Sequence, residues 1–262
     1  MKLNIYQIDA FTDKVFSGNP AAVCPLEAWL SDDLMQKIAM ENNLAETAFY
    51  VKKENVYQIR WFTPTIEVDL CGHATLAAAF VLFKYQNHAD PKINFHSHKS
   101  GNLTVFKQGD LLTLNFPTDV LEPIERFDEL TIGFNIKPIE AFKGKTDYMF
   151  VFENESQIRK LIPSFHEISK LKARGVIVTA KGDQVDFVSR FFGPQSGINE
   201  DPVTGSAHTT LTPYWSKKLG KNEMKAIQLS ARKGYLMCKY SGDRVEISGH
   251  GKEYLKGEIF VE

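Results

Sequence analysis

The chain alternates apolar and polar residues over many short segments, with the period of two that half-buried β-strands produce. Leu3, Ile5 and Ile8 begin this pattern near the N-terminus. Turn-forming residues such as Gly, Asn, Asp and Pro separate the segments. The alternation predicts strands at residues 3–10, 21–24, 47–51, 57–62, 92–96, 103–107, 111–116, 139–142, 148–152, 175–179, 186–192, 226–230, 235–240, 245–249 and 254–260.

A second pattern, with apolar residues three and four positions apart, predicts helices. The clearest start lies at Ser31, a typical helix cap ahead of an apolar series that ends near Asn42. Two apolar stretches predict a helix that ends near Tyr85 and another that ends near Leu219. Shorter helices are expected at residues 125–131, 156–161 and 164–171.

Similar short stretches precede the helices that end near Tyr85 and Leu219. Residues 69–75 are Asp-Leu-Cys-Gly-His-Ala-Thr, and residues 201–208 are Asp-Pro-Val-Thr-Gly-Ser-Ala-His. Each stretch has an acid, then a Gly followed by a polar residue, then a helical apolar run. A helix N-terminus presents unpaired backbone N–H groups and partial positive charge. Two such starts that face each other would bind a small carboxylate, so we expect the functional site there.

The expected elements follow a similar order in the two halves of the chain, with many strands and one apolar central helix in each. This order predicts an α+β protein with an internal duplication rather than a regular β-α-β series. The polar, proline-bearing segment 117–123 marks a domain boundary. We expect an N-terminal domain at residues 1–117 and a C-terminal domain at residues 118–262, and we allow the last strand to pack back on the N-terminal domain.

Composition argues against several classes of function. The 262 residues contain 43% hydrophobic and 24% charged side chains, as globular proteins do. A net charge of −1 without charge blocks gives no support for nucleic-acid binding. No apolar run approaches the ~18 residues of a membrane span, and the first residues do not predict a secretory leader. Three cysteines make no disulfide framework, so we expect a cytoplasmic protein without a membrane partner.

Several motifs together resemble those of one known family. Residues 71–75 are Cys-Gly-His-Ala-Thr and residues 43–47 are Asn-Leu-Ala-Glu-Thr. Each motif alone is weakly specific, but the full set occurs in the family's order and covers nearly the whole chain. The chain thereby resembles the phenazine-biosynthesis PhzF-like isomerases. The matching segments are residues 16–23, 43–47, 60–64, 71–75, 200–207 and 242–247.

This resemblance implies a diaminopimelate epimerase-like fold. In that fold, two similar domains each wrap a curved, mostly antiparallel sheet around a central helix, and the active site lies in the cleft between them. The resemblance also implies an isomerase that moves a proton within a small carboxylate-bearing substrate, and it implies a homodimer. Membership of the family does not imply phenazine production.

Three titratable residues are the catalytic candidates. Glu46 has apolar neighbours, which would raise the pKa of its carboxyl as proton transfer near neutral pH requires; otherwise it is a solvated residue at a strand start. His73 lies at a helix start, which disfavours imidazolium; otherwise it is a capping or core-edge residue. Asp201 precedes Pro202, which restricts its geometry; otherwise it is a simple cap. The resemblance implies that Glu46 carries the proton and that His73 and Asp201 share its site.

Four further residues are candidates for substrate binding. Gly72, Gly205 and Ser206 lie at the two helix starts, where their N–H groups could hold a carboxylate or a developing enolate. The glycines could equally be turn residues. Asn19 is placed in the cleft only by its position in the family motif, and its alternative is a turn residue.

Cys71 raises the possibility of a two-cysteine epimerase. The related epimerases use one cysteine from each half, but the position that matches the second cysteine here is Thr204. A threonine hydroxyl is too weak an acid to replace a thiol, so this mechanism is disfavoured. Cys71 is then a small packed residue.

We expect neither a metal nor a cofactor. His96 and His98 could share one face of a strand, but no cysteine or acid cluster accompanies them. The chain has no phosphate loop and no dinucleotide fingerprint. The favoured function is therefore a cofactor-independent isomerase. The alternatives are a ligand- or protein-binding module on the same fold with little catalysis, or an amino-acid epimerase or racemase that uses Cys71.

Overall fold

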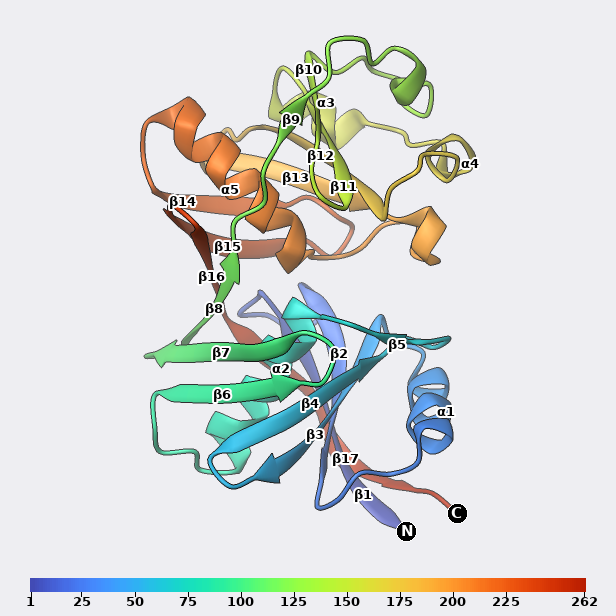
Figure 1. Ribbon diagram of the computed structural model, residues 1–262, viewed down its shortest axis with the longest axis vertical. Helices are drawn as coiled ribbons and strands as arrows, with labels where there is room; N and C mark the ends of the chain where they lie inside the picture. Colours follow the sequence, from blue (N-terminus) through green and yellow to red (C-terminus); the bar gives the residue numbers. More distant parts are fainter. The chain divides into compact units, whose positions relative to one another are not determined.

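The computed structural model describes residues 1–262, which form two compact units (Figure 1). The first unit contains Met1–Asn115 and Ser248–Glu262, and the second contains Phe116–Ile247. The chain therefore leaves the first unit near the proline-bearing segment and returns to it for the final strand.

The first unit is built on one mixed sheet. Successive pairings give the strand order β17-β1-β2-β3-β4-β6-β7-β8, and the short β5 also pairs with β4. The β2–β3 and β4–β6 pairs are parallel, and the others are antiparallel. The strands are β1 (Lys2–Ala10), β2 (Asn19–Leu26), β3 (Glu46–Lys53), β4 (Val56–Phe62), β5 (Glu67–Val68), β6 (Lys92–Ser97), β7 (Gly101–Gln108), β8 (Leu111–Pro117) and β17 (Gly251–Phe260).

Two helices pack against this sheet. Helix α1 (Asp32–Asn42) begins at the expected cap, where the Ser31 hydroxyl accepts a hydrogen bond from the Leu34 N–H at 3.3 Å. It joins a core cluster with Phe49 of β3. Helix α2 (Gly72–Tyr85) is buried along most of its length and contacts β1, β2 and β3. Because side chains alternate along a strand, Glu46 at the start of β3 lies on the face opposite Phe49.

The second unit repeats this construction. Its strand order is β9-β10-β11-β12-β13-β14-β15, with β16 following in sequence. The strands are β9 (Glu122–Pro123), β10 (Glu140–Lys143), β11 (Asp147–Val151), β12 (Gly175–Lys181), β13 (Phe187–Phe192), β14 (Glu223–Gln228), β15 (Gly234–Ser241) and β16 (Arg244–Gly249). The helices are α3 (Glu155–Lys160), α4 (Phe165–Ile168) and α5 (Gly205–Leu219), with 3-10 turns at Glu129–Thr131 and Pro194–Ser196.

The pairing pattern demonstrates the internal duplication. From β1 to β7 the successive pairs are antiparallel, parallel, antiparallel, parallel and antiparallel. From β10 to β15 the same sequence of pairs recurs. The long helix follows the fourth strand in both series, as α2 follows β4 apart from the short β5, and as α5 follows β13. The expected α+β duplication is confirmed.

Helix α5 contains Pro213, which cannot donate a backbone hydrogen bond to the Thr209 carbonyl. The Asp119 N–H donates to that carbonyl instead, at 3.2 Å. The Asp119 carboxylate also accepts from the Thr210 hydroxyl at 2.8 Å. A segment outside the helix thus satisfies the carbonyl that the proline leaves without its helical partner.

The prediction of a helix at residues 125–131 is wrong. Residues 125–131 form only the 3-10 turn Glu129–Thr131 after an irregular stretch. Three apolar side chains spaced three residues apart, Ile124, Phe127 and Leu130, pack against the core of the second unit. Their spacing of three also suits a turn of three residues, and a segment this short gains few helical hydrogen bonds.

Candidate active site

Glu46 and His73 meet in the first unit. Glu46 is the first residue of β3, and His73 is the second residue of α2. The Glu46 Oε2 and His73 Nε2 atoms lie 3.2 Å apart, and the side chains are only 12% and 6% exposed. A carboxylate and an imidazole at this distance are within reach for proton transfer.

The other ring nitrogen of His73 faces two hydrogen-bond donors. The Asn19 amide nitrogen lies 3.2 Å from Nδ1, and the Cys71 sulfur lies 3.5 Å from it. An amide NH₂ group can only donate, and a protonated thiol is a weak donor. With the Asn19 amide in this orientation, Nδ1 accepts, so a neutral His73 carries its proton on Nε2, the nitrogen that lies 3.2 Å from Glu46 Oε2.

Nearby charge changes the proton affinity of His73. Burial acts to lower the pKa of His73, but negative charge at Cys71 and Glu46 outweighs it and raises the pKa well above its ordinary value. Burial raises the pKa of the Cys71 thiol to about 11. The thiol is therefore protonated at neutral pH, and the charge that acts on His73 there belongs to Glu46. This carboxylate opposes the effect that we expected from the helix N-terminus.

Glu46, Cys71 and His73 each place one potential metal-ligand atom within 4.8 Å of the others. The thiol approaches Nδ1 of the imidazole, whereas the carboxylate approaches Nε2. A metal ion binds an imidazole through one nitrogen and needs its other ligands around that same point. The thiol and the carboxylate therefore lie against different nitrogens of His73, an arrangement that does not suit one shared metal ion.

The start of α2 carries no side-chain cap. Cys71 has extended backbone and makes no capping hydrogen bond through its side chain, and the first turn contains no acidic residue. The Thr75 hydroxyl donates instead to the Cys71 carbonyl at 2.6 Å. The first-turn N–H groups, including that of Gly72, lack side-chain caps and are suited to an anion.

The start of α5 is built in the same way in the second unit. Thr204 is the residue before the helix, makes no capping hydrogen bond through its side chain, and is followed by Gly205. The His208 Nδ1–H donates to the Thr204 carbonyl at 2.8 Å, in the place that Thr75 takes on α2. Burial lowers the pKa of His208 to about 4, so this imidazole is neutral.

Asp201 lies in the segment that leads into α5, and it is not the helix cap. Its Oδ2 accepts a hydrogen bond from the Thr204 hydroxyl at 2.5 Å, and the residue is 8% exposed. Gln228, at the end of β14, donates to the Asp201 carbonyl at 2.8 Å. The simple capping interpretation of Asp201 is therefore wrong, and a buried network holds this residue.

Ser206 is the second residue of α5 and belongs to a different network. Its hydroxyl accepts a hydrogen bond from Arg174 Nη1 at 2.9 Å. The same guanidinium pairs with both carboxylate oxygens of Asp147, which is 2% exposed. Ser206 is thus hydrogen-bonded to an ion pair between Asp147, the first residue of β11, and Arg174, the residue before β12.

Sequence reasoning missed Gln228 and Arg174. Neither lies in a motif, and each is far along the chain from the helix start that it contacts. The duplicated strand order offers one signal for Arg174, which directly precedes β12 much as Ala45 and Glu46 lead into β3. No feature of the sequence around Gln228 indicates its role.

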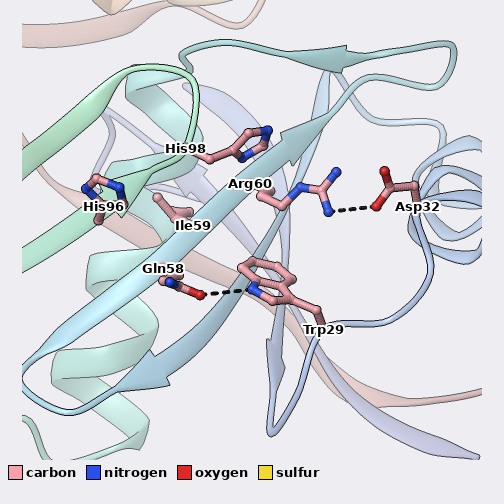
Figure 2. Close-up of a pocket in the computed structure, with 7 residues that line it drawn as sticks. All are labelled: Trp29, Asp32, Gln58, Ile59, Arg60, His96 and His98. Atoms are coloured by element: carbon pink, nitrogen blue, oxygen red, sulfur yellow. Dashed lines mark hydrogen bonds and ion pairs between the residues drawn. The ribbon is translucent and has the colours of Figure 1, made fainter.

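A pocket of about 370 Å³ lies on the other face of β4 from Glu46. Figure 2 shows Arg60 directed toward Asp32, and Trp29 directed toward Gln58. Arg60 also binds both carboxylate oxygens of Glu67, at 2.7 and 2.9 Å. His96 and His98 line this pocket, so they do flank one space. Because Arg60 already holds two acids, its guanidinium is not open to a substrate carboxylate.

No helix in the structure is both long enough and apolar enough to cross a membrane.

Comparison with known proteins gives matches along the whole chain. The profile of the phenazine biosynthesis-like protein family, PhzC-PhzF, matches residues 8–257. An uncharacterised isomerase of Pseudomonas aeruginosa is 51% identical over 261 residues, with full coverage of both chains. A similar isomerase of Halalkalibacterium halodurans is 43% identical, again with full coverage.

Solved structures agree with these matches. A phenazine biosynthesis PhzF family protein of Enterococcus faecalis has a TM-score of 0.97 and 48% identity, and the match covers all of both chains. A hydroxyproline epimerase of Agrobacterium vitis has a TM-score of 0.63 at 10% identity, covering 98% of this chain and 92% of the other. The second likeness concerns the fold alone, and it confirms the expected epimerase-like architecture.

Proposed function

Because the chain belongs to the phenazine biosynthesis-like PhzC-PhzF family, we propose that it is a cofactor-independent isomerase that moves a proton within a small carboxylate-bearing substrate. The observation that carries this proposal is the contact between the Glu46 carboxylate and His73, 3.2 Å apart and almost buried. The two groups can exchange a proton and are shielded from bulk water, as general acid–base catalysis requires.

Glu46 is the proton carrier in this proposal. It takes a proton from a carbon next to a carboxyl group or an unsaturated system and returns it to another carbon of the same molecule. His73 holds and polarises the Glu46 carboxylate through Nε2. Asn19 and Cys71, on the opposite side of the imidazole, fix the orientation of the ring. The same acid serves both carbons, and the proton that it carries exchanges with solvent deuterium between the two transfers.

The helix starts bind the substrate anion. The N–H groups of Gly72 on α2, and of Gly205 and Ser206 on α5, are the donors for a carboxylate or for the negative charge of an enolate-like transition state. Neither first turn contains an acidic side chain that would compete for these donors. Asp201 has the role of a fixed carboxylate that positions and polarises the substrate.

The geometry favours this proposal over its rivals. A binding module would leave Glu46 free to face solvent, but the side chain is 12% exposed and faces His73. A two-cysteine epimerase would need a second thiol at position 204, where Thr204 instead donates its hydroxyl to Asp201. Cys71 is buried, and its raised thiol pKa keeps it protonated at neutral pH, so little thiolate is present to act as a base.

We also propose a cytoplasmic homodimer, as the resemblance to the family implies. All three cysteines are unpaired and buried, as expected in a reducing compartment. Light scattering on the purified protein should give twice the chain mass of 29.7 kDa. A mass equal to that of one chain would contradict the dimer.

Deuterium incorporation tests the isomerase proposal. The protein is incubated in D₂O with a panel of small unsaturated and hydroxylated carboxylic acids, and proton NMR follows the loss of carbon-bound hydrogen. A substrate should gain deuterium at the carbon that receives the proton. Glu46→Gln should slow this exchange by about 10²–10⁴-fold, the usual contribution of a general acid–base.

Glu41→Gln is the matched control, because Glu41 is an exposed residue of α1 in the same unit. This variant should exchange at the rate of the unaltered protein. If Glu46→Gln kept the full rate of exchange on a substrate that the unaltered protein turns over, Glu46 would not be the proton carrier.

A further inference from the structure

The segment Asp201–Thr204 is held from one side by the β14–β15 turn of the second unit. Ser230, in this turn, donates its hydroxyl to the Pro202 carbonyl at 2.8 Å. Gly234, the first residue of β15, packs so closely on Val203 that an added Cβ would lie 2.1 Å from a Val203 methyl group. Gln228, the last residue of β14, is fully buried and bonds to both ends of the segment.

The hydrogen bonds of Gln228 fix which atom of its amide is which. Its Oε1 accepts from the Thr204 N–H at 2.8 Å, so that atom must be oxygen. Its Nε2 donates to the Asp201 carbonyl at 2.8 Å, so that atom must be nitrogen. Exchanging the two atoms would place donor against donor and acceptor against acceptor.

This fixed amide also determines the direction of the next hydrogen bond. Nε2 of Gln228 lies 3.1 Å from the Thr204 hydroxyl oxygen and can only donate to it. The hydroxyl has one proton, and the Asp201 Oδ2 atom lies 2.5 Å away as the acceptor for it. The hydrogen bonds therefore run in one direction, from Gln228 to Thr204 to Asp201.

We propose that Gln228 is a positioning residue of the candidate active site, which orients the Thr204 hydroxyl toward Asp201 and so holds the Asp201 carboxylate in place. This inference rests on the proposed function, in which Asp201 faces the substrate. It assigns Thr204 a role that differs from the thiol of the related epimerases: Thr204 transmits a fixed hydrogen bond and does not move a proton to or from carbon.

Three variants test the direction of this chain. Gln228→Met keeps the length of the side chain but removes every donor and the acceptor. Thr204→Val removes the hydroxyl while the backbone N–H can still donate to Gln228. Thr204→Ser restores the hydroxyl and is the conservative rescue. Gln195→Met is the control, because Gln195 is a part-buried glutamine of the same unit that donates only weakly, at 3.4 and 3.5 Å, to residues outside this segment.

The first readout is independent of turnover. Carbon-detected NMR follows the Asp201 carboxyl carbon as the pH is lowered. A carboxylate that loses a donated hydrogen bond takes up a proton more readily, so the midpoint should move to higher pH by about one unit in Thr204→Val. It should move in the same direction in Gln228→Met, because that variant removes the donor that directs the Thr204 hydroxyl toward Asp201. It should stay at the original pH in Thr204→Ser and in Gln195→Met.

The second readout is the pH profile of deuterium exchange on a substrate found by the screen described above. The acid limb of kcat/KM should move in the same variants and in the same direction. An unchanged midpoint in folded Gln228→Met would overturn the proposal. If that variant does not fold, an unchanged midpoint in Thr204→Val would overturn it equally.

The two readouts separate this inference from the proposed function. A shifted Asp201 titration together with full exchange in Glu46→Gln would retain the positioning role of Gln228 and reject Glu46 as the proton carrier. A normal loss of exchange in Glu46→Gln with an unshifted titration would do the reverse.

Discussion

The starts of α2 and α5 hold matching places in two units with the same strand pattern, yet they carry different chemistry. In the first unit, Glu46 at the start of β3 contacts His73, the second residue of α2. In the second unit, Arg174 directly before β12 contacts Ser206, the second residue of α5. In both units, a residue at or just before the start of a strand contacts the second residue of the long helix. In the first unit the two groups are a carboxylate and an imidazole, and in the second they are a guanidinium and a hydroxyl.

The scaffold that supports the two starts is conserved between the units of this chain. Ser100 donates to the carbonyl of Asp69, two residues before Cys71, at 2.6 Å. Ser230 donates to the carbonyl of Pro202, two residues before Thr204, at 2.8 Å. In both units, the first hairpin turn after the helix, β6–β7 or β14–β15, therefore anchors the segment that leads into that helix.

The side chains at the two helix starts differ in the chemistry that they can perform. The first start contains a carboxylate, an imidazole and a thiol in contact, which are groups that can gain or lose protons. The second start holds Asp201 through hydrogen bonds from Thr204 to its carboxylate and from Gln228 to its backbone carbonyl, and it joins Ser206 to the Arg174–Asp147 ion pair. A duplicated protein can therefore keep proton transfer in one unit and use the other for fixed polar contacts.

The largest expected effect comes from substituting the second residue of each long helix, which is His73 in α2 and Ser206 in α5. His73→Gln should lower the rate of deuterium exchange by about 10²–10⁴-fold, because it removes the ionisable partner of Glu46. Ser206→Ala should lower it by no more than about tenfold, because it removes one hydrogen bond. Initial rates of deuterium incorporation measure both variants. Equal losses would show that the two starts share the proton chemistry.

The next effect concerns the ion pair of the second unit. Arg174→Met would leave the buried Asp147 carboxylate without its partner, and we expect a loss of about 3 kcal/mol in the free energy of unfolding. That value is at the low end for such pairs because the Arg174 side chain is 40% exposed. Urea unfolding measures the loss.

Lys218→Met is the control for Arg174→Met. It removes an exposed ion pair with Glu140 in the same unit and should cost less than about 1 kcal/mol. If both variants lost the same free energy, Arg174 would stabilise the unit no more than a surface lysine does.

The buried histidines of the two starts should give pH dependences of opposite sign. Burial lowers the pKa of His208 to about 4, whereas an unfolded histidine has a pKa of about 6.5. Below about pH 6.5, His208 of the unfolded chain is protonated, whereas His208 of the folded chain becomes protonated only near pH 4. Stability from His208 is therefore present above about pH 6.5 and falls by about 3 kcal/mol as the pH drops to about 4.

His73 should act in the other direction. Its pKa is raised well above the ordinary value, so its contribution is present below about pH 6.5 and is lost as the pH rises through the folded pKa. Urea unfolding at several pH values compares the parent protein with His208→Gln and His73→Gln. His208→Gln should flatten the acid side of the profile, and His73→Gln the alkaline side. Parallel profiles for all three proteins would contradict both assignments.

The smallest expected effect is that of Cys71→Ala. The thiol is buried and protonated at neutral pH, and it is only a weak hydrogen-bond donor to Nδ1 of His73, 3.5 Å away. Deuterium exchange should fall by no more than a few-fold, and iodoacetamide should modify Cys71 only slowly in the folded protein. Rapid inactivation by iodoacetamide that Cys71→Ala prevents would restore the epimerase alternative.

Local sequence patterns predicted most of the helices and strands of this protein. Period-two alternation predicted the main strands, the Ser31 cap predicted α1, and the two glycine-led stretches predicted the starts of α2 and α5. These features depend on neighbours within a few residues, which is why they are visible in a sequence. The short helix at 125–131 failed because its apolar spacing also suits a 3-10 turn packed on the core.

The polar contacts at the candidate site were decided by tertiary structure alone. The sequence named Glu46, His73, Asn19 and Asp201, but not that Glu46 meets Nε2 while Asn19 meets Nδ1 of one imidazole. Gln228 reaches Asp201 across 27 residues of chain because β14 pairs with β13 at that level of the sheet. Hydrogen-bond direction depends on which donor and acceptor atoms the packed strands bring together, and no local pattern carries that information.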